Sequence, residues 1–239
     1  MKKVSSTEKA SAKKIRKTRA KKPVFDGPLV SIVMPAHNAA DFIDDAIHSV
    51  LGQSYGNWEL IVVDDASSDK TLEVVKQFGD ERIRVIKCLR NGGAAKARNR
   101  GVGASKGKFL CFLDADDLWQ PDKLERQLAF MAKKDCAFSF ASYVFADSKG
   151  RPNGKVVRVP ETITYRQVLR SGVVLASTVM FDMSRFSKKD MEIADVKDGS
   201  VWKKVFDRVE SAYGMHSVMA IKGYEAGISF WQKMRRGVR

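Results

Sequence analysis

The sequence has few of the residues that build disulfide scaffolds and zinc sites. Its 239 residues include only three cysteines and three histidines. The cysteines are scattered and form no Cys-x-x-Cys pair, so we expect neither a disulfide framework nor a structural zinc site. Cys111 lies in an apolar run, where a reduced thiol in the core is expected. This cysteine usage fits a reducing cytoplasm.

Long hydrophobic runs are also missing. The longest candidate, Gly172–Phe181, is much shorter than the ~20 apolar residues that a membrane helix needs, and Ser177 and Thr178 interrupt it. The basic region near the first residue is not followed by an apolar one, which argues against a signal peptide. We therefore expect a cytoplasmic protein that can, at most, attach to the inner face of a membrane as a peripheral protein.

Three common catalytic motifs do not occur. Gly101–Gly103 begins a Gly-x-Gly pattern, but Lys106 stands at the position of the third glycine and the segment does not follow the first expected strand. There is no Walker A sequence and no Gly-x-Ser-x-Gly elbow. These absences argue against a dinucleotide-binding fold, a P-loop enzyme and a serine hydrolase.

Positive charge is concentrated at the beginning of the chain. Residues 1–22 hold ten Lys and Arg residues and a single acid, Glu8, so +9 of the net charge of +15 falls there. A segment with so little to bury is expected to be disordered. We take residues 1–26 as a basic tail that attracts an anionic membrane surface, whereas nucleic acid is not the partner we expect. A plain solubilising extension is an equal alternative.

From Leu29 onward, short apolar runs alternate with segments of helical spacing. This alternation predicts an α/β fold with a mainly parallel sheet and right-handed crossovers. In the first half, strands are expected at 29–34, 58–63, 83–86 and 109–113, with Asn38 capping the first helix. In the second half we expect strands at 136–145 and 175–181, and helices at 165–170 and 199–213.

Polar clusters follow three of the expected strands. They are His37–Asn38, Asp64–Asp65 and Asp114–Asp117. Ligands bind at the carboxyl ends of strands in open parallel sheets, so these clusters predict a binding site at one edge. Asp114 and Asp116, two residues apart, can present two carboxylates to one side, and a divalent cation would offset their repulsion. The sequence therefore predicts a metal–diphosphate site that holds Mn²⁺ or Mg²⁺.

The motifs of this first half resemble glycosyltransferase family 2 in order and spacing, from about Leu29 to Leu128. The resemblance implies a GT-A fold and an inverting, metal-dependent transfer of a sugar from a nucleotide-diphospho-sugar. It further implies a nucleotide-sugar-binding half at 27–134 and a smaller, appended acceptor-binding half of the same domain at 135–239. The motifs are Val30–Asn38, Ser49–Ser54, Trp58–Ser67, Asn91–Gly93, Ala97–Gly101 and Phe112–Trp119 with Pro121 and Lys123–Glu125.

The resemblance also assigns roles around the nucleotide. Asp65 would accept a hydrogen bond from the base. His37 stands where the family usually has Tyr or Phe, and its ring can still stack on a base. The segment that would line the base and ribose pocket consists of Pro35, Ala36, His37 and Asn38.

Further roles concern the sugar and the phosphates. By the same resemblance, Asp114 would contact the ribose, Ala115 would also bind the nucleotide-sugar, and Asp116 would bind the metal ion on the diphosphate. Arg98 would face the donor sugar or its phosphates, although an ion pair within the fold is an equal alternative.

The catalytic base is expected in a stretch before the last helix. The family usually has a Glu-Asp pair shortly before a helix Trp, and here Lys197 and Asp198 precede Trp202. Asp198 keeps the family position and is our predicted base, whereas Lys197 replaces the Glu. Asp195 and Glu192 are the neighbouring carboxylates that would take this role if Asp198 did not.

Two other functions stay open on the sequence alone. A nucleotidyltransferase would use the same metal, but no Gly/Arg/Lys-rich triphosphate loop follows the first strand. A binding module with a decayed catalytic half, whose basic tail binds nucleic acid, stays open because of Lys197 and because the C-terminal segment Ile221–Tyr224 departs from the family's Tyr-Arg-x-His. The acceptor is expected to be a glycan or lipid-linked precursor of a surface polysaccharide or lipopolysaccharide. UDP is the commonest donor nucleotide of the family, and GDP and dTDP are not excluded.

Overall fold

A computed structural model of the chain describes residues 27–146, 152–193, 200–209 and 212–222. The basic tail lies outside these ranges, so its attraction to an anionic membrane stays a prediction. Among the described residues, no helix combines the length and the apolar character needed to cross a membrane. Cys88, Cys111 and Cys136 are all free and buried, as the sequence predicted for Cys111.

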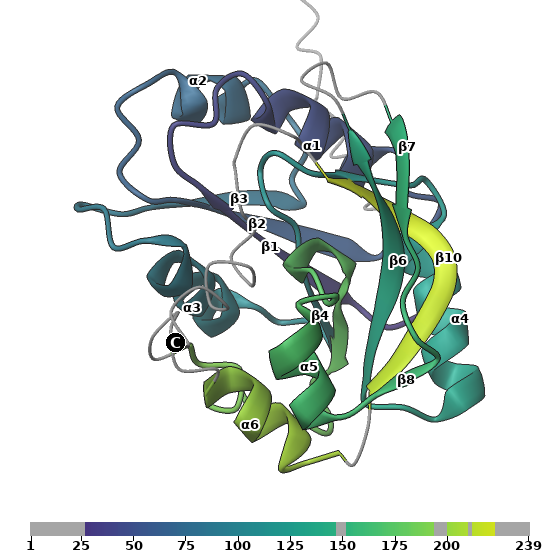
Figure 1. The fold of residues 1–239 in the computed structure, drawn as a ribbon. Helices are drawn as coiled ribbons and strands as arrows, with labels where there is room; N and C mark the ends of the chain where they lie inside the picture. Colours follow the sequence, from purple (N-terminus) through teal and green to yellow (C-terminus); the bar gives the residue numbers. More distant parts are fainter. Residues whose placement is uncertain (1–26, 147–151, 194–199, 210–211, 223–239) are drawn as a thin grey trace, which may run out of the picture.

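The described elements alternate strand and helix over the first half of the chain (Figure 1). The helices are α1 (Ile43–Leu51), α2 (Thr71–Lys76), α3 (Ala94–Ala104), α4 (Lys123–Lys134), α5 (Tyr165–Ser171) and α6 (Ser200–Phe206), with a 3₁₀ turn, η1 (Ala176–Thr178). The strands are β1 (Val30–Ala36), β2 (Trp58–Asp64), β3 (Ile83–Lys87), β4 (Phe109–Phe112), β5 (Leu118–Trp119), β6 (Phe138–Ala146), β7 (Pro152–Val157), β8 (Thr162–Ile163), β9 (Met180–Asp182) and β10 (Ala212–Lys222).

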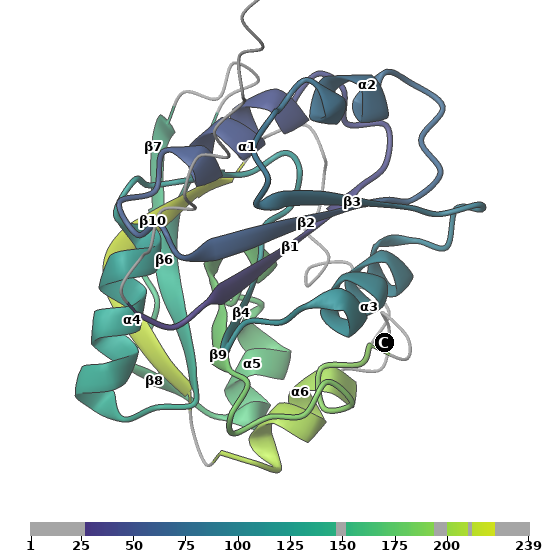
Figure 2. The ribbon, with the colours of Figure 1, turned by 180° about the vertical axis from the view of Figure 1, so that it is seen from behind.

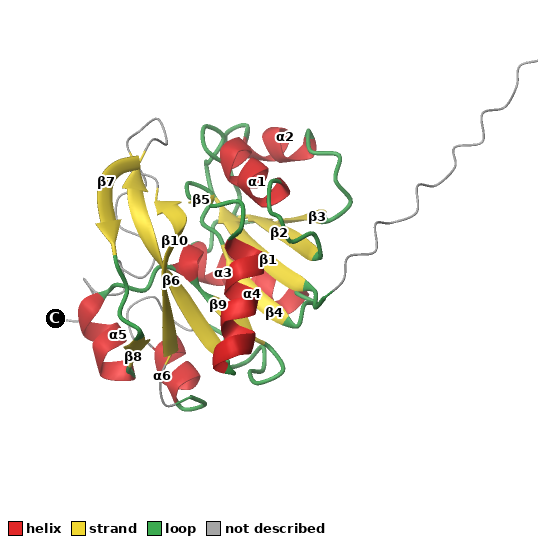
Figure 3. Cartoon of the chain, turned by 90° about the vertical axis from the view of Figure 1, so that its right-hand side faces the viewer, coloured by secondary structure: helices red, strands yellow, loops and turns green. Residues whose placement is uncertain are grey.

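One sheet joins both halves of the chain, in the order β3-β2-β1-β4-β9-β6-β10-β5. The first four strands in this order are parallel, as predicted. Strand β9 is antiparallel to both of its neighbours, β4 and β6, and so connects the parallel half to the second half. In Figure 3 the second half, with β6, β7 and β10, stands beside β1–β4.

Each face of the sheet has its own apolar core, because side chains on a strand alternate between the two faces. Ile32 and Leu60 belong to the core under α1, α2 and α4. Val33 and Ile61, one residue further along each strand, belong to the core under α3, α5 and α6. Figure 2 shows α1 and α2 on one side of β1–β3 and α3 on the other. Burial on both faces explains why β1 and β2 are nearly continuous apolar runs, whereas β3 at the edge of the sheet is only partly buried.

Two of the expected elements in the second half are partly wrong. The predicted strand at 175–181 begins instead with the turn η1, in which the Thr178 hydroxyl donates to the carbonyl of Leu175 at 2.8 Å. Such local side-chain bonds compete with strand pairing. The predicted helix at 199–213 ends at Phe206, and Tyr213 lies in β10, which pairs with β6 and β8. These pairings with distant segments override the local helical spacing.

Two glycines of α3 differ sharply in their surroundings. A Cβ on Gly101 would lie 2.2 Å from Cγ1 of Val33, a fully buried residue of the central strand β1. A Cβ on Gly103 would have no atom within 4 Å. Gly101 therefore lets α3 pack closely on the sheet, whereas Gly103 is exposed and contributes no such contact.

We expect Gly101→Ala to lower the free energy of unfolding by about 2–3 kcal/mol, because Val33 has no room to move. Gly103→Ala is expected to leave it unchanged or raise it by up to about 1 kcal/mol, since alanine favours a helix over glycine. Urea denaturation of both variants and the parent measures the difference. Equal stabilities for the two variants would contradict the packing role of Gly101.

Candidate active site

The predicted polar clusters lie at one edge of the sheet. Strand β1 ends at Ala36, which pairs with Asp64 at the end of β2. The N–H of Leu113, just after β4, donates to the carbonyl of Val33 at 3.1 Å, so the chain leaves β4 at this same edge. The carboxyl ends of the three parallel strands thus bring the clusters together, as the sequence predicted.

An acidic cluster follows β4. Carboxylate oxygens of Asp114, Asp116 and Asp117 all lie within 4.8 Å of one another. Asp117 is buried and the other two are partly exposed. Oxygen ligands of this kind are those that Mg²⁺ and Mn²⁺ prefer, so the residues present fit such an ion. Asp117 was not among the predicted ligands, although its place in the acidic run was a signal for it.

Arg98 reaches the acidic cluster from α3. Its side chain is almost completely buried, and its guanidinium forms an ion pair with the carboxylate of Asp114. The ion pair that the sequence left as an alternative therefore exists. It places a positive charge in contact with one carboxylate of the cluster. The contact of Arg98 with the donor stays a prediction.

Asp65 is bound to the loop that precedes α3. The N–H of Gly92 lies 3.0 Å from each of its carboxylate oxygens, and the N–H of Gly93 donates to Oδ2 at 2.6 Å. The resemblance motif Asn91–Gly93 thus has a structural role, because it anchors the start of α3 to the end of β2. The predicted hydrogen bond between Asp65 and a nucleotide base is a further role that stays a prediction.

The segment after β1 presents two exposed polar side chains beside Asp65. Nδ1 of His37 donates to the carbonyl of Asp65 at 2.9 Å. Asn38 has a positive φ of 49°, and its Oδ1 accepts the N–H of Ser68 at 2.9 Å. The prediction that Asn38 caps the first helix was therefore wrong, because α1 begins at Ile43 and has no side-chain cap. Pro35, Ala36 and Ala115 line this edge and are half-buried or buried.

The resemblance motif that contains the acidic cluster also includes a buried lysine, Lys123. Nζ of Lys123 is 3.8 Å from the ring centroid of Trp119 and 3.6 Å from Sγ of Cys111. Burial lowers the pKa of Lys123. Trp119 and Lys123 of the resemblance motif therefore pack on each other, and Nε1 of Trp119 donates to the carbonyl of Ser177 at 2.7 Å.

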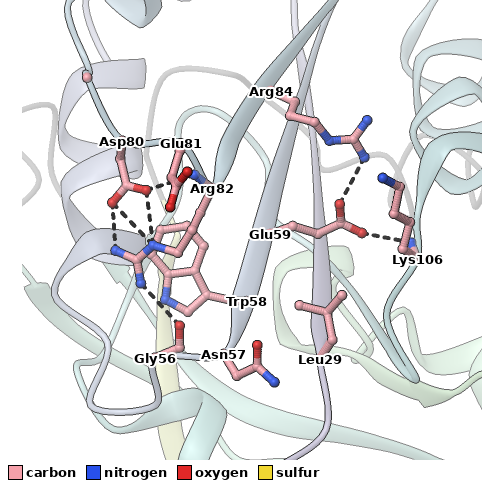
Figure 4. A pocket seen from close by; sticks show the side chains of 11 residues that line it. Leu29, Gly56, Asn57, Trp58, Glu59, Asp80, Glu81, Arg82, Arg84 and Lys106 are labelled. Atoms are coloured by element: carbon pink, nitrogen blue, oxygen red, sulfur yellow. Dashed lines mark hydrogen bonds and ion pairs between the residues drawn. The ribbon is translucent and has the colours of Figure 1, made fainter. Parts of the chain in front are cut away.

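A cavity of about 640 Å³ lies at the opposite, amino end of β1 and β2 (Figure 4). Glu59 in its wall accepts hydrogen bonds from Ser31, from the N–H of Lys106 and from Arg84. Burial alone would raise the pKa of Glu59, but these bonds bring it below its ordinary value. Arg82 stacks on Trp58 at 3.7 Å. Glu59, Arg84 and Arg82 are thus engaged with neighbouring residues of the cavity wall. We therefore take the acidic cluster, and not this cavity, as the candidate site.

The predicted catalytic base lies outside the described residues, as do Lys197 and Asp195. The described chain stops before them at Ile193 and resumes at Ser200. Asn99 of α3 fixes the first of these ends, because its side chain accepts the N–H of Ile193 at 2.9 Å and donates to its carbonyl at 2.8 Å. Ile193, the last described residue before that segment, is therefore fixed to α3, the helix that also carries Arg98. Glu192 is exposed.

The comparison with protein families decides the family. The profile described as "Glycosyl transferase family 2" matches residues 31–192. The chain belongs to glycosyl transferase family 2. The match covers β1 to the residues just after β9, so it includes the acidic cluster, Arg98 and Asp65.

Curated relatives of the family 2 chain are named glycosyltransferases. One is "Putative teichuronic acid biosynthesis glycosyltransferase TuaG" of Bacillus subtilis, 41% identical over 196 residues, which cover 81% of this chain and 78% of that one. Another is "UDP-Glc:alpha-D-GlcNAc-diphosphoundecaprenol beta-1,3-glucosyltransferase WfgD" of Escherichia coli, 37% identical over 181 residues, which cover 76% and 71%.

Solved structures confirm the GT-A fold. S. aureus TarS 1-349, crystallised with UDP-GlcNAc, matches with a TM-score of 0.69 and 21% identity over 84% of this family 2 chain. The mannosyltransferase PcManGT from Pyrobaculum calidifontis, in complex with GDP-Man and Mn²⁺, matches with a TM-score of 0.62 and 17% identity over 85% of it. This chain covers 60% of the length of each of the two structures.

Proposed function

We propose that this family 2 chain is a metal-dependent inverting glycosyltransferase. It moves a sugar from a nucleotide-diphospho-sugar, with UDP as the nucleotide we favour, to a glycan or lipid-linked acceptor in the assembly of a surface polysaccharide. The observation that carries the proposal is the cluster of Asp114, Asp116 and Asp117 at the carboxyl edge of the sheet, with oxygens within 4.8 Å of one another. The named activity of WfgD on a UDP-sugar and a diphosphoundecaprenol acceptor supports the substrate class.

The leaving group of this reaction is a nucleoside diphosphate, on which negative charge grows as the anomeric bond breaks. Mn²⁺ or Mg²⁺ held by Asp116 and its neighbours supplies positive charge that stabilises this leaving group. Arg98 pairs with Asp114 and so fixes the orientation of that carboxylate within the cluster. His37 and Asn38, exposed at the end of β1, form the wall on which we place the base and the ribose.

The acceptor hydroxyl must lose a proton as it attacks the sugar from the face opposite the leaving group. We propose that the carboxylate of Asp198 accepts this proton. A general base must lie within hydrogen-bond reach of the hydroxyl from which it takes the proton. The paired bonds of Asn99 to Ile193 support the assignment, because they fix the chain five residues before Asp198 to the helix that carries Arg98. Two residues after Asp198, the chain enters α6, whose Trp202 packs on Phe138.

A thermal-shift titration tests the proposal. We expect UDP and Mn²⁺ together to raise the melting temperature of the full chain by several degrees, about 2–4 °C for each kcal/mol of binding energy. UDP with EDTA, or UMP with Mn²⁺, is expected to give a much smaller rise, because the diphosphate and the ion bind as a pair. If no nucleoside diphosphate gives a Mn²⁺-dependent rise, the proposed function is wrong.

A further inference from the structure

Ser177 connects the second half of the chain to the acidic cluster. It lies in η1 and its side chain is almost completely buried. The N–H of Asp114 donates to Oγ of Ser177 at 3.1 Å, and the Ser177 hydroxyl donates to Oδ2 of Asp117 at 2.5 Å. One hydroxyl therefore contacts both ends of the acidic run. Asp114 and Asp117 also form a turn, because the N–H of Asp117 donates to the carbonyl of Asp114 at 3.0 Å.

We infer that Ser177 is a positioning residue that sets the geometry of the metal-binding carboxylates. The inference rests on the proposed function and adds to it a residue far along the chain from the cluster. A serine hydroxyl has one proton and two lone pairs. When the hydroxyl donates its O–H to Asp117, its oxygen still has a lone pair to accept the N–H of Asp114, so both hydrogen bonds form at once and fix the turn that contains Asp116.

The backbone around Ser177 is itself held firmly in place. Its carbonyl accepts the Nε1–H of buried Trp119 at 2.7 Å. The carbonyl of the next residue, Thr178, accepts Nε2 of the buried Gln127 at 3.0 Å. Because two buried side chains, Trp119 and Gln127 of α4, bind the carbonyls of η1, the position of the Ser177 hydroxyl is fixed relative to the sheet.

Ser177→Ala would remove a donor to a buried carboxylate that lies within the cluster. Outer partners of metal ligands orient those ligands, and losing one typically costs 10- to 100-fold in metal affinity. The control is Thr178→Val, because the Thr178 hydroxyl is equally buried in the same turn but donates to the carbonyl of Leu175 rather than to a carboxylate. Both variants thus remove one buried hydroxyl from η1.

The experiment measures the affinity of Mn²⁺ for the full chain saturated with UDP, by calorimetric titration well below the melting temperatures. We expect Ser177→Ala to bind Mn²⁺ about 10- to 100-fold more weakly than the parent, while Thr178→Val keeps the parental affinity. Melting temperatures without metal are expected to fall similarly in both variants. Ser177→Cys, close in shape but with a weak donor, is the second variant, and we expect it to lie between Ser177→Ala and the parent.

The outcomes separate the two proposals. Parental Mn²⁺ affinity in Ser177→Ala and Ser177→Cys would overturn the role of Ser177 and leave the proposed function intact. An equal loss of Mn²⁺ affinity in Thr178→Val would also overturn it, because the effect would then come from the packing of η1 alone. Absence of Mn²⁺ binding by the parent chain would instead contradict the proposed function itself.

Discussion

Asp116→Asn is expected to reduce sugar transfer at least about 100-fold, because the amide keeps the shape of the side chain but removes the charge that holds the cation. Asp116 lies in the cluster whose oxygens fall within 4.8 Å of one another. The same variant is expected to lose most of the Mn²⁺-dependent rise in melting temperature with UDP. Release of UDP from a UDP-sugar that the parent uses as donor, with and without acceptor, measures the first effect.

Asp122→Asn is the matched control for this substitution. The side chain of Asp122 is half-exposed, lies close to Asp116 in the sequence and pairs with Arg126 across one turn at 3.2 Å, but it is not part of the acidic cluster. An exposed pair of this kind contributes little to stability. We therefore expect the Asp122 variant to keep parental transfer. Full Mn²⁺-dependent stabilisation in the Asp116 variant would contradict the assignment of the metal to this cluster.

The parallel half of the fold was predictable because three of its strands, β1, β2 and β4, are buried on both faces. A strand such as β2 must then be a continuous apolar run, and its end is marked by the first polar residues, here Asp64 and Asp65. Since parallel strands place these ends at one edge, the sequence also predicted where the candidate site lies. The position of the acidic cluster follows from this rule and the register of β1 with β4.

The second half was less predictable because distant pairings decide its elements. Residues 207–213 continue a helical spacing of apolar side chains, but pairing of β10 with β6 and β8 ends the helix at Phe206. The role of Ser177 could not be predicted either. Local sequence shows only a serine in an apolar run, whereas its contact with Asp117 depends on how β9 pairs with β4.

Arg98 illustrates a further limit of the sequence. An arginine on a helix beside the predicted site is compatible with a ligand contact and with an ion pair, and only the packing of α3 on the sheet shows its bond to Asp114. Gly101 makes that close packing possible. The Arg98–Asp114 ion pair thus depends on how closely α3 packs on the sheet, and the spacing of residues within α3 does not predict this.

Asp198→Asn is expected to reduce sugar transfer at least about 100-fold, because the amide cannot take the proton of the acceptor hydroxyl. The affinity for UDP with Mn²⁺ is expected to stay at the parental value, since the general base acts on the acceptor and not on the donor. This separates Asp198 from Asp116, whose substitution is expected to change both quantities. Steady-state transfer and a UDP titration in the presence of Mn²⁺ measure them.

Glu192→Gln and Asp195→Asn serve as the comparison for this last variant, because they change the nearest carboxylates in the same stretch. If Asp198 is the base, both keep most of the transfer activity. Retained activity in Asp198→Asn together with a large loss in one of the other two variants would assign the role of general base to that other carboxylate. Glu192 directly precedes Ile193, which Asn99 fixes to α3, so its substitution also tests whether the base lies on the anchored side of the segment or beyond it.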